Sequence, residues 1–185
     1  MGNSGTLFYV VGPSGVGKDS ILNLLRAAQG NEKIIFLHRY ITRPANAGNE
    51  NHIALTPLEF EKRKAAGLFA MSWESHGLSY GLGTELNDYL AKGYHVIMNG
   101  SRGYLPEALK RNPDLHVILI QADKTILAER LRARGRETEA EIQERLERAE
   151  AFKVETPKLT VIENNGTLEE AVEQFISVLR EVVEV

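Results

Sequence analysis

A short apolar run, a glycine-rich turn and a helical pattern follow one another near the start of the chain. Leu7–Val11 predicts a buried strand, and a helix is expected from about Asp19 to Ala28. The turn between them matches G-x-x-x-x-G-K in the strand–turn–helix setting that this motif needs. No other feature of the sequence constrains the fold as strongly.

Such a turn binds phosphate because its backbone N–H groups point into one concavity beside the positive end of a helix. Lys18 can then reach the β- and γ-phosphates of a nucleotide. A tight turn with a surface lysine is the alternative, but strand, spacing and helix all agree with the phosphate site. The residues expected to bind ATP are Gly12, Pro13, Ser14, Gly15, Val16, Gly17, Lys18, Asp19 and Ser20.

One position departs from the usual motif. Asp19 follows Lys18 where a Ser or Thr hydroxyl normally binds Mg²⁺. A carboxylate is a hard oxygen ligand that suits Mg²⁺, directly or through a bound water. Ser20 could supply a hydroxyl instead, and Asp19 could simply favour the positive end of the helix. We expect Asp19 to contact the metal, with both alternatives open.

Length and composition set ordinary bounds. The 185 residues are enough for one domain with a substantial core, and the net charge of −3 argues against nucleic acid or an anionic membrane as partner. The absence of cysteine excludes disulfides and thiolate metal sites. No stretch approaches the roughly 20 apolar residues of a membrane span, and the N-terminus lacks a signal-peptide layout. We expect a cytoplasmic protein, with the oligomeric state open and a homodimer as one option.

Short apolar runs alternate with helical patterns along the rest of the chain. Further strands are expected at Lys33–His38, Tyr94–Met98, Leu115–Gln121 and Leu159–Glu163. Further helices are expected at Thr84–Lys92, Gly103–Arg111, Lys124–Arg134, Glu139–Phe152 and from Leu168 onward. Runs that are apolar throughout fit parallel strands covered on both faces. The sequence therefore predicts an α/β fold, a three-layer sandwich around a parallel sheet.

Residues 39–82 interrupt this alternation. They include a polar, loop-like stretch at Thr42–Asn51, a short helix near Pro57–Ala66, and aromatic and small residues at Phe69–Gly81. An insertion beside the carboxyl ends of strands is where an open α/β sheet receives its second ligand. Each polar side chain there could alone be a surface group, but as a set they indicate an acceptor pocket. The candidate acceptor-binding residues are Arg39, Arg43, His52, His76 and Tyr80.

A second basic cluster lies in the helical patterns after residue 124. Its members are Arg130, Arg132, Arg134, Arg136, Arg145 and Arg148. They could pair with nearby Glu129, Glu137, Glu141 and Glu144 on the surface. Phosphoryl transfer, however, needs cations over the transferring group, and a mobile lid excludes water. We favour an arginine-rich lid at about residues 132–150, with Lys18, Arg134 and Arg145 as the catalytic residues.

Together these motifs resemble those of the guanylate kinases. The resemblance includes G-P-S-G-x-G-K, Thr42-Arg43-Pro44, Ser79-Tyr80-Gly81, the run 130–135 with Arg145, and Asn165 before the last helix. It covers nearly the whole chain in the same order. It implies a single P-loop kinase domain over residues 1–185, with a core (1–38 and 83–185), an acceptor-binding insertion (39–82) and a lid. It also implies that Arg43 and Tyr80 lie at the acceptor phosphate and Asn165 near the adenine edge of ATP.

The guanine-specific parts of that pattern are missing. After Arg43-Pro44 the second arginine and the glycine-linked glutamate are absent, and Ser72 stands before Trp73 where a guanine-reading glutamate is expected. Met98–Gly103 replaces the aspartates at the end of the middle strand. A site built to hydrogen-bond guanine would lose much of its discrimination through such changes. GMP is therefore not the expected acceptor.

A more specific resemblance is to the ribose 1,5-bisphosphate phosphokinases of bacterial phosphonate metabolism. It is carried by Gly-Lys-Asp-Ser at 17–20 and by residues 39–44, 51–55 and 76–81. It implies that ATP, with Mg²⁺, phosphorylates α-D-ribose 1,5-bisphosphate to ADP and 5-phospho-α-D-ribose 1-diphosphate (PRPP). Such an acceptor needs no catalytic base, because a phosphate with a second pKa of about 6 is already ionised near neutrality.

Two alternatives remain open at this point. A guanylate kinase, or a kinase of another small phosphorylated metabolite, would keep the ATP-side residues and differ only in the acceptor pocket. A non-catalytic guanylate-kinase-like binding module is the other, although such a module has no need of Lys18 or of the basic lid.

Overall fold

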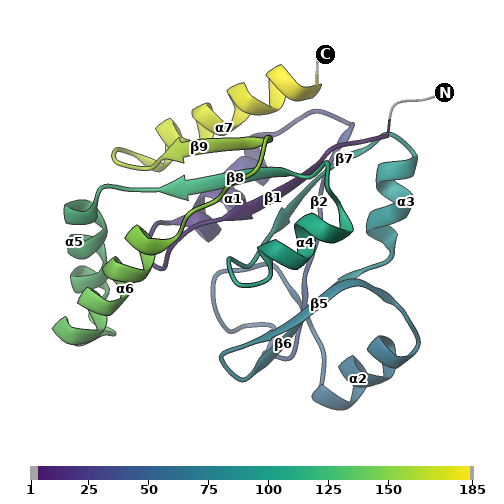
Figure 1. Ribbon diagram of the computed structural model, residues 1–185, viewed down its shortest axis with the longest axis horizontal. Helices are drawn as coiled ribbons and strands as arrows, with labels where there is room; N and C mark the ends of the chain where they lie inside the picture. The colour runs from purple at the N-terminus through teal and green to yellow at the C-terminus, as the bar shows by residue number, and fades with distance from the viewer. Residues whose placement is uncertain (1–3, 184–185) are drawn as a thin grey trace. The chain divides into compact units, whose positions relative to one another are not determined.

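The computed structural model describes residues 4–183, and strands alternate with helices as expected outside residues 39–82 (Figure 1). The elements in chain order are β1 (Leu7–Val11), α1 (Lys18–Ala28), β2 (Ile34–Phe36), β3 (Tyr40–Ile41), β4 (Ile53–Ala54), α2 (Pro57–Ala65), β5 (Phe69–Ser75), β6 (Leu78–Gly83), α3 (Glu85–Ala91), β7 (His95–Asn99), α4 (Leu105–Arg111), β8 (His116–Gln121), α5 (Lys124–Arg134), α6 (Glu139–Ala151), β9 (Leu159–Glu163) and α7 (Leu168–Val183). Each strand and helix predicted from the sequence is present close to its expected bounds.

The larger sheet has five strands in the order β2-β7-β1-β8-β9. β2 and β7 run parallel with Ile34 opposite His95, and β8 and β9 run parallel with Val117 opposite Leu159. All five residues of β1 are buried, as are most residues of β7 and half of those of β8. This is the pattern of parallel strands covered on both faces. The predicted α/β class with a parallel sheet is confirmed.

A second sheet, formed by strands between residues 40 and 83, was not predicted. It has four strands in the order β4-β3-β6-β5, and its β5–β6 hairpin is antiparallel with Trp73 opposite Tyr80. β3 and β4 have only two residues each, too few for an alternating pattern to appear in the sequence. The hairpin turns at His76 and Gly77, whose φ values of 51° and 75° match the positive φ that two-residue hairpin turns favour.

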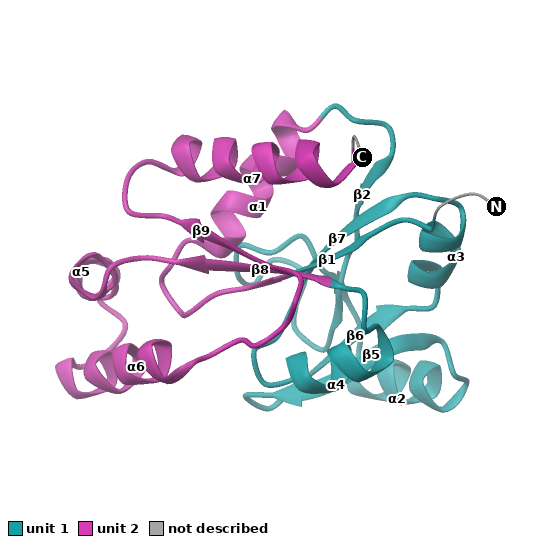
Figure 2. Ribbon diagram, turned by 45° about the horizontal axis from the view of Figure 1, so that its top comes forward, with its two compact units in different colours: residues 1–9, 30–115 teal, residues 10–29, 116–185 magenta. Residues whose placement is uncertain are grey.

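The chain divides into two compact units, each built from two segments (Figure 2). Unit 1 comprises residues 1–9 and 30–115, and unit 2 comprises residues 10–29 and 116–185. The second sheet and all candidate acceptor-binding residues belong to unit 1. The glycine loop and the helices of the predicted lid belong to unit 2. The division into core, insertion and lid remains a prediction about how these parts work.

Unit 2 is held together by the packing of its first helix against its last. The apolar face of α1, which includes the fully buried Leu25, contacts α7, whose buried residues include Phe175. Two capping boxes also form. The Thr138 and Thr167 hydroxyls accept from the backbone N–H groups of Glu141 and Glu170, and the carboxylates of these glutamates accept from the backbone N–H groups of Thr138 and Thr167. Within residues 4–183, none of the helices is both long and apolar enough to cross a membrane.

Candidate nucleotide and acceptor sites

The loop between β1 and α1 has the backbone shape that a phosphate site requires. Gly15 and Gly17 have φ values of 81° and 89°, in the left-handed region that favours glycine. A Cβ atom at Gly15 would lie 2.7 Å from Leu131 Cδ2, so the loop packs directly on α5. α1 begins at Lys18, immediately after this loop, so the positive end of the helix lies at the loop's last residue.

Lys18, Asp19 and Ser20 form the first turn of α1, and all three are half-buried. In kinase sites Mg²⁺ takes one or two protein oxygens and completes its shell with substrate phosphates and water. The Asp19 carboxylate and the Ser20 hydroxyl are such oxygens, at the position where the motif places its metal ligand. The residues present therefore fit Mg²⁺ that arrives with the nucleotide.

Asn164, which is not among the predicted site residues, also holds the glycine loop in place. Its side chain is buried, with the residue 2% exposed, and Nδ2 donates a 2.7 Å hydrogen bond to the Val16 carbonyl. Its backbone N–H donates to the Gln121 carbonyl at the end of β8, at 2.8 Å. No local motif signals this contact, because Asn164 and Val16 are 148 positions apart in the chain.

The next residue, Asn165, was predicted to lie near the adenine edge of ATP. Its side-chain oxygen accepts a 2.7 Å hydrogen bond from the backbone N–H of Asp123, the residue that caps α5. Asn165 therefore ties the end of β9 to the start of α5. Its contact with adenine remains a prediction.

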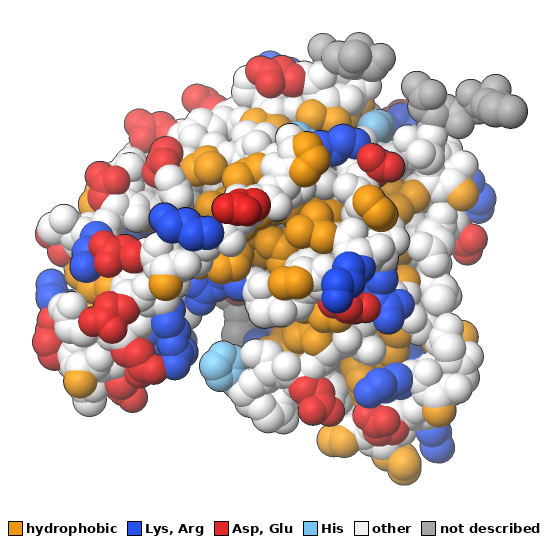
Figure 3. Space-filling view, viewed as in Figure 1, with side chains coloured by type: hydrophobic (Ala, Val, Ile, Leu, Met, Phe, Trp, Pro, Cys, Tyr) orange, Lys and Arg blue, Asp and Glu red, His pale blue; other side chains and the backbone are white. Residues whose placement is uncertain are grey.

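Four arginines of α5 and α6 are paired with glutamates. Arg134 and Arg145 both contact Glu137, in the loop between the two helices. Two exposed pairs, Arg132–Glu139 and Arg148–Glu144, lie nearby. Figure 3 accordingly shows positive and negative side chains interleaved over this part of the surface. The glutamate pairing that the sequence offered as an alternative to a lid is therefore present, and the lid role remains a prediction.

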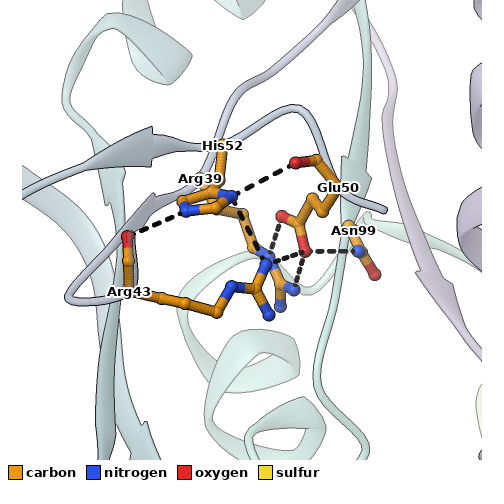
Figure 4. A network of polar contacts seen from close by, with 5 residues as sticks. All are labelled: Arg39, Arg43, Glu50, His52 and Asn99. Atoms are coloured by element: carbon orange, nitrogen blue, oxygen red, sulfur yellow. Dashed lines mark hydrogen bonds and ion pairs between the residues drawn. The ribbon is translucent and has the colours of Figure 1, made fainter. Parts of the chain in front are cut away.

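In unit 1, polar side chains gather around the carboxylate of Glu50, which is not among the predicted site residues (Figure 4). Arg39 binds it with two nitrogens, of which Nε lies 2.6 Å from Oε2. Asn99 at the end of β7 donates from Nδ2 to Oε1 at 3.1 Å. The side chains of Arg39 and Glu50 are only 10% and 11% exposed, so this pair is largely withdrawn from water.

Arg43 is held more loosely in the same cluster. Its Nη2 lies 3.9 Å from Glu50 Oε1 and 3.3 Å from His52 Nδ1. His52 Nε2 lies 3.0 Å from the Arg43 carbonyl, and its Nδ1 also lies 3.2 Å from the Glu50 carbonyl, so the ring links Arg43 to the backbone beside Glu50. Arg43 Nε is buried and makes no hydrogen bond. Of the two arginines, Arg43 therefore retains more capacity for a ligand phosphate.

Aromatic rings cover the other side of Arg39. Its guanidinium lies 4.8 Å from the ring centroid of Tyr80, and Tyr80 stacks on Trp73 at 5.6 Å with an interplanar angle of 2°. Tyr104 stacks on the same tryptophan at 4.9 Å. Burial raises the pKa of Tyr104 above its ordinary value, so this phenol is uncharged near neutrality.

Four of the five predicted acceptor residues are thus brought together: Arg39, Arg43, His52 and Tyr80. His76 is not part of their contacts. It is exposed at the tip of the β5–β6 hairpin, where its positive φ helps to form the turn. A signal for Glu50 was available, because it is the one acidic residue between Arg39 and Leu58 and two arginines precede it closely.

The glycine loop at the end of β1, the helix that follows it and the parallel sheet define a P-loop phosphotransferase. The chain belongs to the guanylate kinase family, whose model matches residues 4–182.

Within this family the chain is similar to two curated relatives that are both named ribose 1,5-bisphosphate phosphokinase PhnN. The protein of Thiobacillus denitrificans is 52% identical over 178 residues, which cover 96% of this chain and 94% of the relative. That of Psychromonas ingrahamii is 49% identical over 179 residues, covering 96% and 91%. Among solved structures, a guanylate kinase from Anaplasma phagocytophilum has a TM-score of 0.69 at 20% identity, covering 97% of this chain and 86% of that one. This last likeness confirms the fold.

Proposed function

We propose that this chain transfers the γ-phosphoryl group of ATP to α-D-ribose 1,5-bisphosphate, giving ADP and 5-phospho-α-D-ribose 1-diphosphate. The observation that carries the proposal is that the Glu50 carboxylate is bound by other side chains of the protein. This carboxylate accepts from Arg39 and Asn99 and lies near Arg43, so it is engaged within the protein. The cluster offers cationic and aromatic groups to a ligand, which suits a sugar with two phosphates better than a purine edge. The names of the two curated relatives support the same acceptor.

On the donor side, residues 12–17 and the start of α1 hold the ATP phosphates with backbone N–H groups. Lys18 neutralises charge at the β- and γ-phosphates. Asp19, with Ser20, would hold Mg²⁺, which neutralises phosphate charge when bound. Arg134 and Arg145 place guanidinium groups over the transferring phosphoryl group, the role that arginines take in such reactions.

On the acceptor side, Arg43 binds a phosphate of the sugar. An oxygen of the 1-phosphate attacks the γ-phosphorus, and the bond from that phosphorus to the β–γ bridging oxygen breaks as ADP leaves. The attacking oxygen is ionised near neutrality, so the protein has no proton to remove. Catalysis then consists of positioning the substrates and neutralising their charge.

An acceptor panel tests the proposal directly. ATP and Mg²⁺ are supplied with ribose 1,5-bisphosphate, ribose 5-phosphate or GMP, and the products are identified by phosphorus NMR. We expect ribose 1,5-bisphosphate to have the highest kcat/KM. A higher kcat/KM for GMP would replace this proposal with a guanylate kinase. A protein that neither binds ATP nor turns over any acceptor would instead be a binding module.

Replacing Arg43 with alanine should weaken use of the acceptor and spare ATP. The change removes a charge-assisted phosphate contact of about 1.5–3 kcal/mol, which corresponds to roughly tenfold to a hundredfold in acceptor kcat/KM. Steady-state kinetics with the acceptor varied would measure this, alongside ATP binding without acceptor. Arg111→Ala, at an exposed arginine of α4 paired with Glu107, is the matched control. Equal weakening of ATP binding by Arg43→Ala would show that the division into donor and acceptor sides is wrong.

Asp19→Ala should raise the Mg²⁺ concentration needed for half-maximal rate more than it raises the ATP requirement. The reason is that a carboxylate at this position of the loop contributes directly to the metal's oxygen shell. Titrations of Mg²⁺ at fixed ATP, and of ATP at saturating Mg²⁺, separate the two effects. An unchanged Mg²⁺ titration would favour the alternative in which Asp19 only stabilises the start of α1.

A further inference from the structure

Two arginines from different helices share one buried carboxylate in unit 2. Arg134 is the last residue of α5, Arg145 lies within α6, and Glu137 lies in the loop that joins these helices. The Glu137 side chain is 7% exposed, whereas those of Arg134 and Arg145 are 31% and 37% exposed. The carboxylate is thus enclosed while both guanidinium groups still reach the surface.

Both arginines contact the same oxygen atom. Nη2 of Arg134 bonds Glu137 Oε1, and Nη2 of Arg145 lies 3.3 Å from that atom. The second oxygen, Oε2, is buried and accepts no hydrogen bond. Because a guanidinium group has five N–H donors, each arginine keeps most of its donors for another anion. Glu137 therefore fixes where two cations lie without using up their binding capacity.

This arrangement differs from the other ion pairs of α5 and α6. Glu144 and Arg148 are 58% and 62% exposed, and pairs of that kind contribute little to stability because water competes for both partners. Burying a carboxylate is costly unless it is paired, so the geometry of the Glu137 pairs is much more constrained. Glu144 provides a matched comparison on the same helix as Arg145.

The helix that carries Arg134 is also fixed relative to the phosphate loop. Leu131 and Leu127 of α5 pack against Gly15, and Asn165 binds the backbone at the start of α5. Glu137 holds the other end, where Arg134 projects. The position of this guanidinium group is therefore determined by contacts at both ends of the helix and along its length.

We infer that Glu137 is a positioning residue for phosphoryl transfer, which aligns Arg134 and Arg145 on the γ-phosphoryl group of ATP. The inference rests on the proposed function, since it takes these two arginines as the cations of the reaction. A negative charge beside an anionic substrate opposes binding by itself. Glu137 contributes through the orientation that it imposes on the two arginines.

The test compares Glu137→Gln, Glu137→Asp and the control Glu144→Gln with the wild-type protein. For Glu137→Gln we expect kcat to fall roughly tenfold to a hundredfold, as misplacement of catalytic groups produces. The ATP dissociation constant without acceptor should stay the same or decrease, because a negative charge is removed. Glu137→Asp keeps the charge and should recover part of the loss, and Glu144→Gln should behave as wild type. The thermal unfolding midpoint of each variant shows whether it is folded.

A purely structural role would weaken ATP binding together with kcat, and that result would overturn the inference. So would a folded Glu137→Gln variant that retains wild-type kcat, or an equal loss in Glu144→Gln. Should the wild-type protein fail to use ribose 1,5-bisphosphate, the proposed function fails separately. The same comparison would then be made on the rate of ATP hydrolysis in the absence of acceptor, which needs the same alignment of arginines.

Discussion

Lys18→Ala is expected to lower kcat by roughly 10²–10³-fold, the loss seen when a preorganised group that stabilises transition-state charge is removed. Lys18 opens α1 directly after the glycine loop and is half-buried there, so water replaces its ammonium group poorly. In phosphoryl transfer the lysine of such a loop offsets charge that develops between the β- and γ-phosphates. The effect should therefore appear in kcat as well as in the ATP KM.

The measurement is steady-state turnover with saturating acceptor, combined with thermal unfolding to verify the fold. Lys110→Ala is the matched control, since the Lys110 side chain in α4 is 78% exposed. Wild-type turnover by a folded Lys18→Ala protein would contradict the phosphate-loop mechanism itself, whatever the acceptor is.

Glu50→Ala should destabilise unit 1 by about 3–5 kcal/mol, the usual cost of removing one partner from a buried ion pair. The variant leaves the Arg39 guanidinium group without its carboxylate, and Arg39 is only 8% exposed. Arg43 and Asn99 lose a contact at the same time. Because Trp73 is the one tryptophan of the chain and lies 5.9 Å from that guanidinium group, its fluorescence should report unfolding of this region.

Urea unfolding followed by Trp73 fluorescence gives the change in free energy. Glu74→Ala is the control, because Glu74 lies on the same hairpin and is exposed. A second variant identifies the cause: Glu50→Leu combined with Arg39→Met removes both charges and should be more stable than Glu50→Ala alone. If Glu50→Ala costs no more than Glu74→Ala, the ion pair is not what holds this cluster.

Local patterns predicted much of this protein. The prediction of a strand, glycine loop and helix at residues 7–28 was correct, because hydrophobic periodicity and glycine spacing can be recognised within a short stretch of sequence. The second sheet was not predicted, because its shortest strands have two residues each and are stabilised by neighbours distant in sequence.

The parts of the site that were missed depend on contacts between distant positions or on burial. Asn164 contacts the glycine loop across 148 residues, which no local pattern can indicate. Glu50 lies in a polar stretch that reads as a loop, and only the fold withdraws it from water. Glu137 was considered as one of several partners for surface arginines. Its enclosure, and its sharing between two helices, follow from the packing of α5 against α6.

The packing of α1 against α7 has a consequence for how the protein is made. Ile21, Leu22 and Leu25 leave the ribosome long before the helix that covers them, residues 168–183. Contacts over such separations form slowly, and apolar surface exposed in the meantime favours aggregation. Residues 12–18 are therefore synthesised long before the helix that packs against α1 is available to stabilise them. Unit 2 of the nascent chain can therefore complete its packing only when α7 has emerged.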